Sequence, residues 1–200
     1  MTTQKKPINL FKLVDIPNLI EIQTELKTCF ENNYYDHVFN TESGTAVHKK
    51  NYLYPGILET IWKECPSWIK FLEDMKLLDR WATAYFSTVV DGSKVRPIAH
   101  VDDPHRFFAL QIPVINCEGS YTVFYDADPK DAIKALIPYY PDSIGYTNDK
   151  LNGEIGILPS HKPAFIDISV PHRPVVPYDE PRVLLTARFK PELWDYLENF

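Results

Sequence analysis

Two residues with metal-binding side chains, His100 and Asp102, stand two positions apart in the segment VRPIAHVDDP. Side chains of an extended chain alternate between its two sides, so this spacing places the imidazole and the carboxylate on the same side. The two groups can then bind one ion together. A local hydrogen bond between them is the alternative interpretation.

A third candidate ligand, His172, lies far along the chain in the segment FIDISVPHRPVV. Only strand pairing across a β-barrel could bring it beside His100. Two imidazoles and one carboxylate form the facial triad that binds non-heme Fe(II) and leaves coordination positions open for substrates and O2. His100, Asp102 and His172 are therefore the candidate metal ligands and catalytic residues.

The last expected strand, 182–189, has one polar and one apolar face. The polar face carries Arg182, Leu184, Thr186 and Arg188, and the apolar face carries Val183, Leu185, Ala187 and Phe189. An arginine that points into a small β cavity needs an anionic partner, because an unpaired buried guanidinium is costly. A cosubstrate with a carboxylate group would satisfy Arg182 through two parallel hydrogen bonds.

Short runs of β-branched and aromatic residues, separated by Pro, Asp, Gly and Asn, dominate the chain after Trp81. They predict strands at 82–90, 95–101, 107–115, 121–125, 164–170 and 182–189. So many strands in one region indicate a sandwich or barrel. A longer excursion lies near 126–160, and we expect a short helix within it around 130–136.

The first 80 residues have the sequence pattern of helices. Leu19, Ile22, Leu26 and Phe30 recur at spacings of three or four, which predicts an amphipathic helix over 17–31. The stretch 55–79 predicts two short helices divided by Pro66, because proline cannot continue a helix. We expect these helices to cover the apolar face of the last strand from outside the barrel, while its polar face lines a cavity.

The sequence resembles the Fe(II)/2-oxoglutarate-dependent oxygenases. The resemblance rests on HVDDP with His100 and Asp102, on PHRPVVPYDEPR with His172 and Arg182, and on the order of helices followed by strands from about residue 17 to 190. The segment HVDDPHR is similar to the proximal segment of prolyl-hydroxylase-type members.

The resemblance implies a mainly β (α+β) fold, a double-stranded β-helix or jelly roll with N-terminal helices packed outside. The chain would be one domain over 1–200, with a helical cover at 1–80, a jelly-roll core at 81–190 and an insertion near 126–160. Fe(II) would be held by His100, Asp102 and His172. 2-Oxoglutarate would chelate this iron and pair its distal carboxylate with Arg182.

The activity that the resemblance implies is hydroxylation, or demethylation through hydroxylation, with O2 as the second cosubstrate and with release of succinate and CO2. The intact Asp102 argues against halogenation, because halogenases of the family replace that carboxylate to make room for chloride. Many members carry Ser or Thr two residues after the arginine, where this chain has Leu184. Another polar side chain must then help to hold the cosubstrate.

Gln111, Tyr85 and Tyr121 are the candidates for this additional cosubstrate contact, and side chains of the core or rim are the alternative interpretation. Two arginines, Arg106 and Arg188, are candidate substrate contacts. Arg106 could instead be a solvated loop residue, and Arg188 could lie beyond the end of the barrel.

Charge and composition restrict the partners. The chain has 21 Lys and Arg against 27 Asp and Glu, a formal net charge of -6, which disfavours broad nucleic-acid binding. A small molecule, a free amino acid, a protein side chain and a modified base all stay compatible as substrates. No stretch approaches the roughly 18 apolar residues that span a membrane. The three cysteines form no CxxC pair, and no signal peptide is recognisable, so we expect a cytoplasmic protein.

Two other classes of function stay open. A cupin-like metalloenzyme that does not use 2-oxoglutarate could employ the same barrel and histidines, but it would have no need of Arg182. A non-catalytic β-barrel binding module would bind its ligand without His172.

Overall fold

The computed structural model describes residues 10–33, 57–89, 99–102, 108–134, 144–177 and 182–190. Every statement below about a strand, a helix or a contact concerns these residues.

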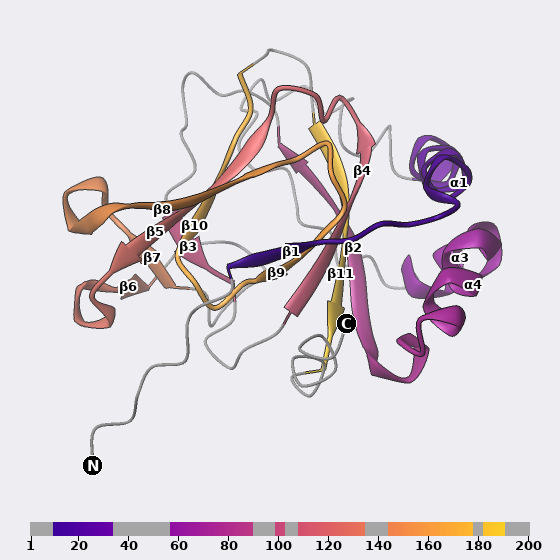
Figure 1. The fold of residues 1–200 in the computed structure, drawn as a ribbon, viewed down its shortest axis with the longest axis horizontal. Coiled ribbons are helices and arrows are strands. Elements are labelled where there is room, and N and C mark those ends of the chain that lie inside the picture. Colours follow the sequence, from indigo (N-terminus) through magenta and orange to yellow (C-terminus); the bar gives the residue numbers. More distant parts are fainter. Residues whose placement is uncertain are drawn as a thin grey trace.

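The described residues form two antiparallel sheets that face each other (Figure 1). One sheet has five strands that together comprise more residues than the six strands of the other, and it is called the larger sheet. It contains, in spatial order, β1 (Phe11–Leu13), β9 (Ala164–Asp167), β4 (Phe108–Ile115), β11 (Arg182–Phe189) and β2 (Trp81–Val89). The smaller sheet contains β6 (Ile133–Lys134), β7 (Ile144–Tyr146), β3 (Ala99–Val101), β10 (His172–Val175), β5 (Tyr121–Ala127) and β8 (Leu151–Pro159).

The chain winds back and forth between these sheets. Strands β2 and β4 belong to the larger sheet, whereas β3 and β5 belong to the smaller one; after β8, strands β9, β10 and β11 alternate in the same way. This alternation is the winding of a jelly roll. The predicted fold class, a mainly β jelly roll with helices outside, is confirmed.

Three helices, α1 (Leu19–Asn33), α3 (Ile57–Glu64) and α4 (Pro66–Asp74), cover the outer face of the larger sheet (Figure 1). Pro66 occupies the first turn of α4, where no backbone donor is lost, and so separates it from α3. The side chain of Gln23 on α1 donates to the carbonyl of Pro113 on β4 at 2.9 Å. No helix among the described residues is long and apolar enough to cross a membrane.

The two largest apolar clusters of the described residues follow from this layering. The outer core joins the helices to the apolar face of β11, so that Ile22 and Leu26 share a cluster with Val183 and Leu185. The inner core lies between the two sheets and contains Ala109, Phe124, Leu158 and Ile166. As expected, the apolar face of the last strand meets the helices, and its polar face points into the barrel.

The structure differs from the sequence expectations at several elements. The expected strand 164–170 is the short β9 followed by a turn, because the Asp167 carboxylate accepts hydrogen bonds from the backbone and hydroxyl of Ser169. Strands β8 and β10 were not expected, and β8 lies within the stretch predicted to be an insertion. In place of a helix at 130–136, the described residues form a 3-10 turn, Pro129–Asp131, and β6.

Candidate metal centre

Strand pairing brings the two candidate histidines together. His172 is the first residue of β10, and its Cα is the direct cross-strand partner of His100 on β3. Directly paired residues place their side chains on the same face of a sheet. This face is the inner one, because the other cross-strand partner of His172 is Phe124 of the inner core.

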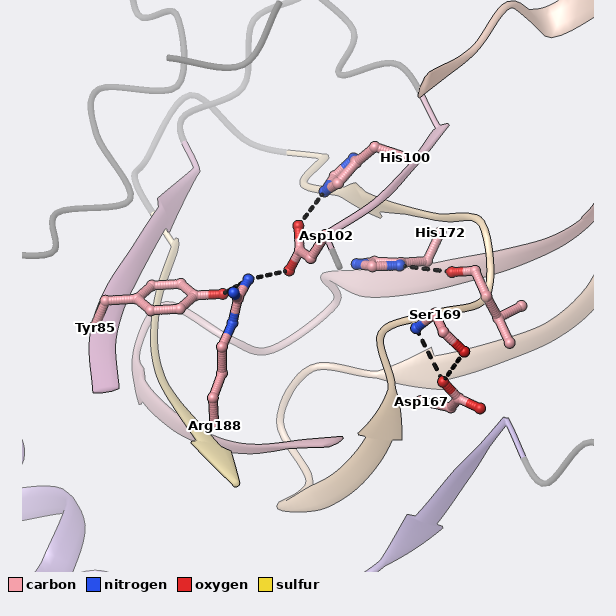
Figure 2. A network of polar contacts seen from close by, with 8 residues as sticks. Tyr85, His100, Asp102, Asp167, Ser169, His172 and Arg188 are labelled. Carbon is pink, nitrogen blue, oxygen red and sulfur yellow. Dashed lines mark hydrogen bonds and ion pairs between the residues drawn. The ribbon is translucent and has the colours of Figure 1, made fainter. Parts of the chain in front are cut away.

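Asp102 completes the group one residue beyond the end of β3. The candidate ligand atoms of His100, Asp102 and His172 all lie within 4.8 Å of one another. Nε2 of His100 and Oδ1 of Asp102 are 3.2 Å apart, and the centroids of the two imidazole rings are 4.8 Å apart. All three side chains are buried and converge on one region inside the barrel (Figure 2).

The turn between β9 and β10 orients two of these ligands. Nδ1 of His172 lies 2.9 Å from the carbonyl oxygen of Val170. Because a carbonyl only accepts, Nδ1 carries the proton and Nε2 keeps its lone pair for an ion. The backbone N–H of Asp102 donates to the carbonyl of Ile168 in the same turn at 3.3 Å. Figure 2 shows Asp167 and Ser169 bonded to each other within this turn.

Electrostatics keep His172 neutral and Asp102 ionised at neutral pH. Burial, together with the neighbouring His100, lowers the pKa of His172 to about 4. Burial alone would raise the pKa of Asp102, but the hydrogen bond and charge of His100 and the charge of Arg188 outweigh it, so the pKa lies well below its usual range. Both groups are thus in the state that a metal ion needs.

Arg188 lies inside the barrel, against the candidate metal ligands and not beyond the barrel end. Its Nη2 donates to Oδ2 of Asp102 at 2.9 Å. The guanidinium carbon also lies 5.3 Å from the centroid of the Tyr85 ring, and Nη2 is 3.4 Å from the Tyr85 hydroxyl. The residue expected to contact substrate therefore contacts a candidate metal ligand.

Arg182, at the other end of β11, is a buried cation. It is only 2% exposed, and its Nη1 donates to the Ser160 hydroxyl at 3.0 Å. Within the described part of the chain, Nε of Arg182 has no hydrogen-bond partner, and no carboxylate is among the groups that shift its pKa. Burial lowers the pKa of Arg182 to about 10, which leaves the group charged at neutral pH.

A polar row connects the two arginines along the inner face of the larger sheet. Thr186 of β11 is the cross-strand partner of Tyr85 on one side and of Gln111 on the other. Gln111 is partly exposed within an otherwise buried stretch of β4. The buried Thr186 hydroxyl has no partner among the described residues. Sequence reasoning did not propose Thr186, although its place on the polar face of the last strand was visible.

Ser160 belongs to the site although the sequence did not indicate it, whereas Tyr121 and Arg106 are not placed there by the structure. Ser160 was not expected at all, because its contact with Arg182 joins the ends of two strands that are distant in sequence. Tyr121 pairs with Val175, so it lies on the face of the smaller sheet opposite His172. The structure therefore does not bring Tyr121 to the site. Arg106 lies outside the described residues.

This arrangement can hold a divalent metal ion. Two imidazole nitrogens and one carboxylate oxygen approach one point, and this donor set suits Fe(II) with coordination positions left for other ligands. Arg182 adds a site for an anion inside the same barrel, because a buried guanidinium without a counterion is unfavourable.

No protein-family model matches the sequence, and no curated protein sequence matches it. Among solved structures, the non-heme alpha-ketoglutarate-dependent epimerase SnoN from nogalamycin biosynthesis is similar, with 12% identity and a TM-score of 0.46 over 90% of this chain and 76% of that chain. The protein ycfD from E. coli is similar with 16% identity and a TM-score of 0.37 over 65% of this chain and 32% of that chain.

Proposed function

We propose that this protein is an Fe(II)- and 2-oxoglutarate-dependent oxygenase that hydroxylates an organic substrate, or demethylates it through hydroxylation. The proposal is based on the presence of a candidate metal site and a buried arginine inside the same barrel. Three candidate metal ligands converge within 4.8 Å, and a buried arginine has no carboxylate partner among the described residues.

The three ligands bind the metal through Nε2 of His172, a carboxylate oxygen of Asp102 and the imidazole of His100. The turn that contains Val170 fixes the His172 ring before any ion arrives, because Nδ1 is already bonded to the Val170 carbonyl. Burial of all three side chains excludes bulk water from the reacting atoms. When bound, Fe(II) with 2-oxoglutarate and O2 supplies the oxidation that inserts one oxygen atom into a C–H bond and converts 2-oxoglutarate to succinate and CO2.

Arg182 binds the distal carboxylate of 2-oxoglutarate in this proposal. The Ser160 hydroxyl, 3.0 Å from Nη1, orients the guanidinium. Thr186, Gln111 and Tyr85 lie on the same face between Arg182 and Arg188 and offer further hydrogen-bonding groups to the cosubstrate. Ser160 and Thr186 supply the hydroxyl groups that Leu184 lacks.

The buried charge of Arg182, which has no carboxylate partner among the described residues, favours this function over a metalloenzyme that does not use 2-oxoglutarate. Such an enzyme would keep a desolvated cation in its core with no use for it. For the substrate, we propose a small molecule, an amino acid or a protein side chain. The three cysteines are free and buried, which supports a reducing compartment such as the cytoplasm.

Anaerobic titration of the metal-free protein with Fe(II), and then with 2-oxoglutarate, tests the proposal. We expect one Fe(II) per chain and the visible charge-transfer band of an iron-chelated 2-oxo acid, and we expect His172→Ala to lose both. Iron binding without the band would favour a metalloenzyme of another class. Full Fe(II) binding by the His172→Ala variant would refute the ligand assignment.

A further inference from the structure

The two oxygens of Asp102 have different partners. Oδ1 lies 3.2 Å from Nε2 of His100, on the side where the candidate ligand atoms converge. Oδ2 accepts a hydrogen bond from Nη2 of Arg188 at 2.9 Å. Figure 2 shows the carboxylate between the imidazole of His100 and the guanidinium of Arg188. Oδ1 therefore lies beside the candidate ligand His100, and Oδ2 is held by the Arg188 cation.

This difference matters because a carboxylate can bind a metal through one oxygen or through both. A single-oxygen contact keeps one more coordination position open than a two-oxygen contact. An iron site that must also accept a chelating 2-oxo acid and O2 needs every such position. Resting on the function proposed above, we propose that Arg188 is a positioning residue that restricts Asp102 to binding the metal through one oxygen.

Arg188 is itself firmly placed for this role. It lies on β11, between β4 and β2 in the larger sheet, with Ala109 and Thr83 as cross-strand partners. Its guanidinium is stacked over the Tyr85 ring, with the carbon 5.3 Å from the ring centroid. A planar guanidinium can stack and donate toward Asp102 at the same time, whereas a lysine ammonium keeps the charge without this fixed geometry.

Because Arg188 is charged, the proposal predicts different effects of its removal on Fe(II) affinity and on 2-oxoglutarate affinity. With Arg188 present, the negative charge of Asp102 is already offset inside the barrel, so a divalent ion enters a nearly neutral site. Without Arg188, both carboxylate oxygens become available and the site becomes more negative. Metal binding should then stay the same or tighten, while chelation by 2-oxoglutarate weakens. A merely structural role would weaken both.

The matched control is Arg173, on the opposite face of β10 from the site. It resembles Arg188 in its contacts, because it stacks over Tyr125 at 5.2 Å and donates to Asn148 at 3.1 Å. It makes no contact with the candidate ligands that the structure records. The Arg173→Met variant should therefore bind Fe(II) and 2-oxoglutarate as the wild type does.

The experiment compares anaerobic titrations of wild type, Arg188→Met, Arg188→Lys and Arg173→Met with Fe(II) and then 2-oxoglutarate. We expect Arg188→Met to bind Fe(II) at least as tightly as the wild type, to lose at least about tenfold in 2-oxoglutarate affinity and to shift the charge-transfer band. The Arg188→Lys variant keeps the interior charge and should show a smaller loss of 2-oxoglutarate affinity. It also provides the test if the Arg188→Met variant does not fold.

Unchanged 2-oxoglutarate affinity in the folded Arg188 variants, or equal weakening of Fe(II) and 2-oxoglutarate binding, would overturn the proposal. These results differ from a failure of the proposed function, in which the wild type itself would form no Fe(II)–2-oxoglutarate complex.

Discussion

At the scale of single residues, Arg182 distinguishes the proposed function from its alternatives. Its interior charge is unfavourable in the absence of an anion, since its recorded hydrogen-bond acceptor among the described residues is the neutral Ser160 hydroxyl, and its Nε has no partner there. Replacement of a buried ionic group by an apolar one of similar size is often stabilising. We therefore infer that Arg182 is retained to bind an anionic ligand, although its buried charge lowers the free energy of unfolding.

We accordingly expect Arg182→Met to have opposite effects on stability and on cosubstrate binding. The free energy of unfolding of the metal-free protein should rise by about 2 kcal/mol, because a desolvated cation is removed. The affinity of the Fe(II)-loaded protein for 2-oxoglutarate should fall at least about a hundredfold, while Fe(II) affinity is unchanged. Urea unfolding and anaerobic titration measure the two effects, with Arg173→Met as control. Unchanged 2-oxoglutarate affinity would remove Arg182 from the site.

The buried His172 makes the stability of the metal-free protein sensitive to acid. Its pKa is about 4 in the folded protein, below the ordinary 6.5. Between these two values the unfolded chain binds the proton more readily, so stability should fall by about 3 kcal/mol as the pH falls from about 6.5 to about 4. Asp102 adds to this loss at still lower pH, because its pKa is lowered in the fold.

Urea unfolding of the metal-free protein at a series of pH values measures this dependence. The His172→Gln variant, which has no group titrating in this range at that position, should show a flatter profile. A wild-type profile that is flat between pH 6.5 and pH 4 would contradict the burial of a neutral His172.

At the scale of elements, the turn from Asp167 to Val170 holds the metal centre together. It supplies the carbonyl that orients His172 and the carbonyl that receives the Asp102 backbone N–H. The Asp167 carboxylate stabilises the turn by accepting from Ser169. Groups that orient metal ligands commonly change metal affinity by about 10- to 100-fold when they are removed.

For this reason we expect Asp167→Ala to lower Fe(II) affinity by about tenfold and the free energy of unfolding by about 1 kcal/mol. A suitable control is Asp126→Ala. Asp126 is an exposed residue of β5, and its carboxylate accepts a hydrogen bond from the Asn152 side chain at 3.1 Å. Competition for Fe(II) with a chelator of known affinity would measure the change. Equal Fe(II) affinity in both variants would show that the turn is held by its backbone alone.

Periodicity at this scale predicted some elements and not others. The alternation in 182–189 correctly predicted that the apolar face of β11 meets the helices, and Pro66 correctly predicted the break between α3 and α4. The residues of β8, with two glycines and an asparagine, and of β10, with Pro174, lack the pattern of a strand and form one because neighbouring strands pair with them.

Contacts between distant elements could not be predicted from local pattern. The alternation along 182–189 placed Arg188 on the same face as Arg182, but its contact with Asp102 was not visible in the sequence, because Asp102 lies beyond the end of β3. The proximity of Ser160 to Arg182 likewise follows from the pairing of whole strands. In contrast, the metal-binding residue types of His100, Asp102 and His172 were recognisable because their chemistry is local to each side chain.

At the scale of the whole molecule, the helices and the barrel enclose the three cysteines. Cys29, Cys65 and Cys117 are free and buried. A hydrogen bond with Cys29 and burial raise the pKa of Cys65, and burial raises the pKa of Cys117. Thiolates, which are the reactive form, are therefore scarce in the folded protein.

The folded protein should consequently react slowly with a thiol reagent such as Ellman's reagent, and all three thiols should react after unfolding in guanidinium. Absorbance of the released thiolate counts them under both conditions. Rapid labelling of the native protein would mean that the helical cover opens readily and does not pack on the sheet as described.

An anaerobic crystal structure with 2-oxoglutarate and Mn(II) in place of Fe(II) would test the central claim most directly. The account predicts a metal ion bound by His100, Asp102 and His172, with Asp102 contributing one oxygen, and a 2-oxoglutarate molecule whose distal carboxylate pairs with Arg182. A metal ion at these residues with no 2-oxoglutarate on Arg182, or no metal ion there at all, would contradict it.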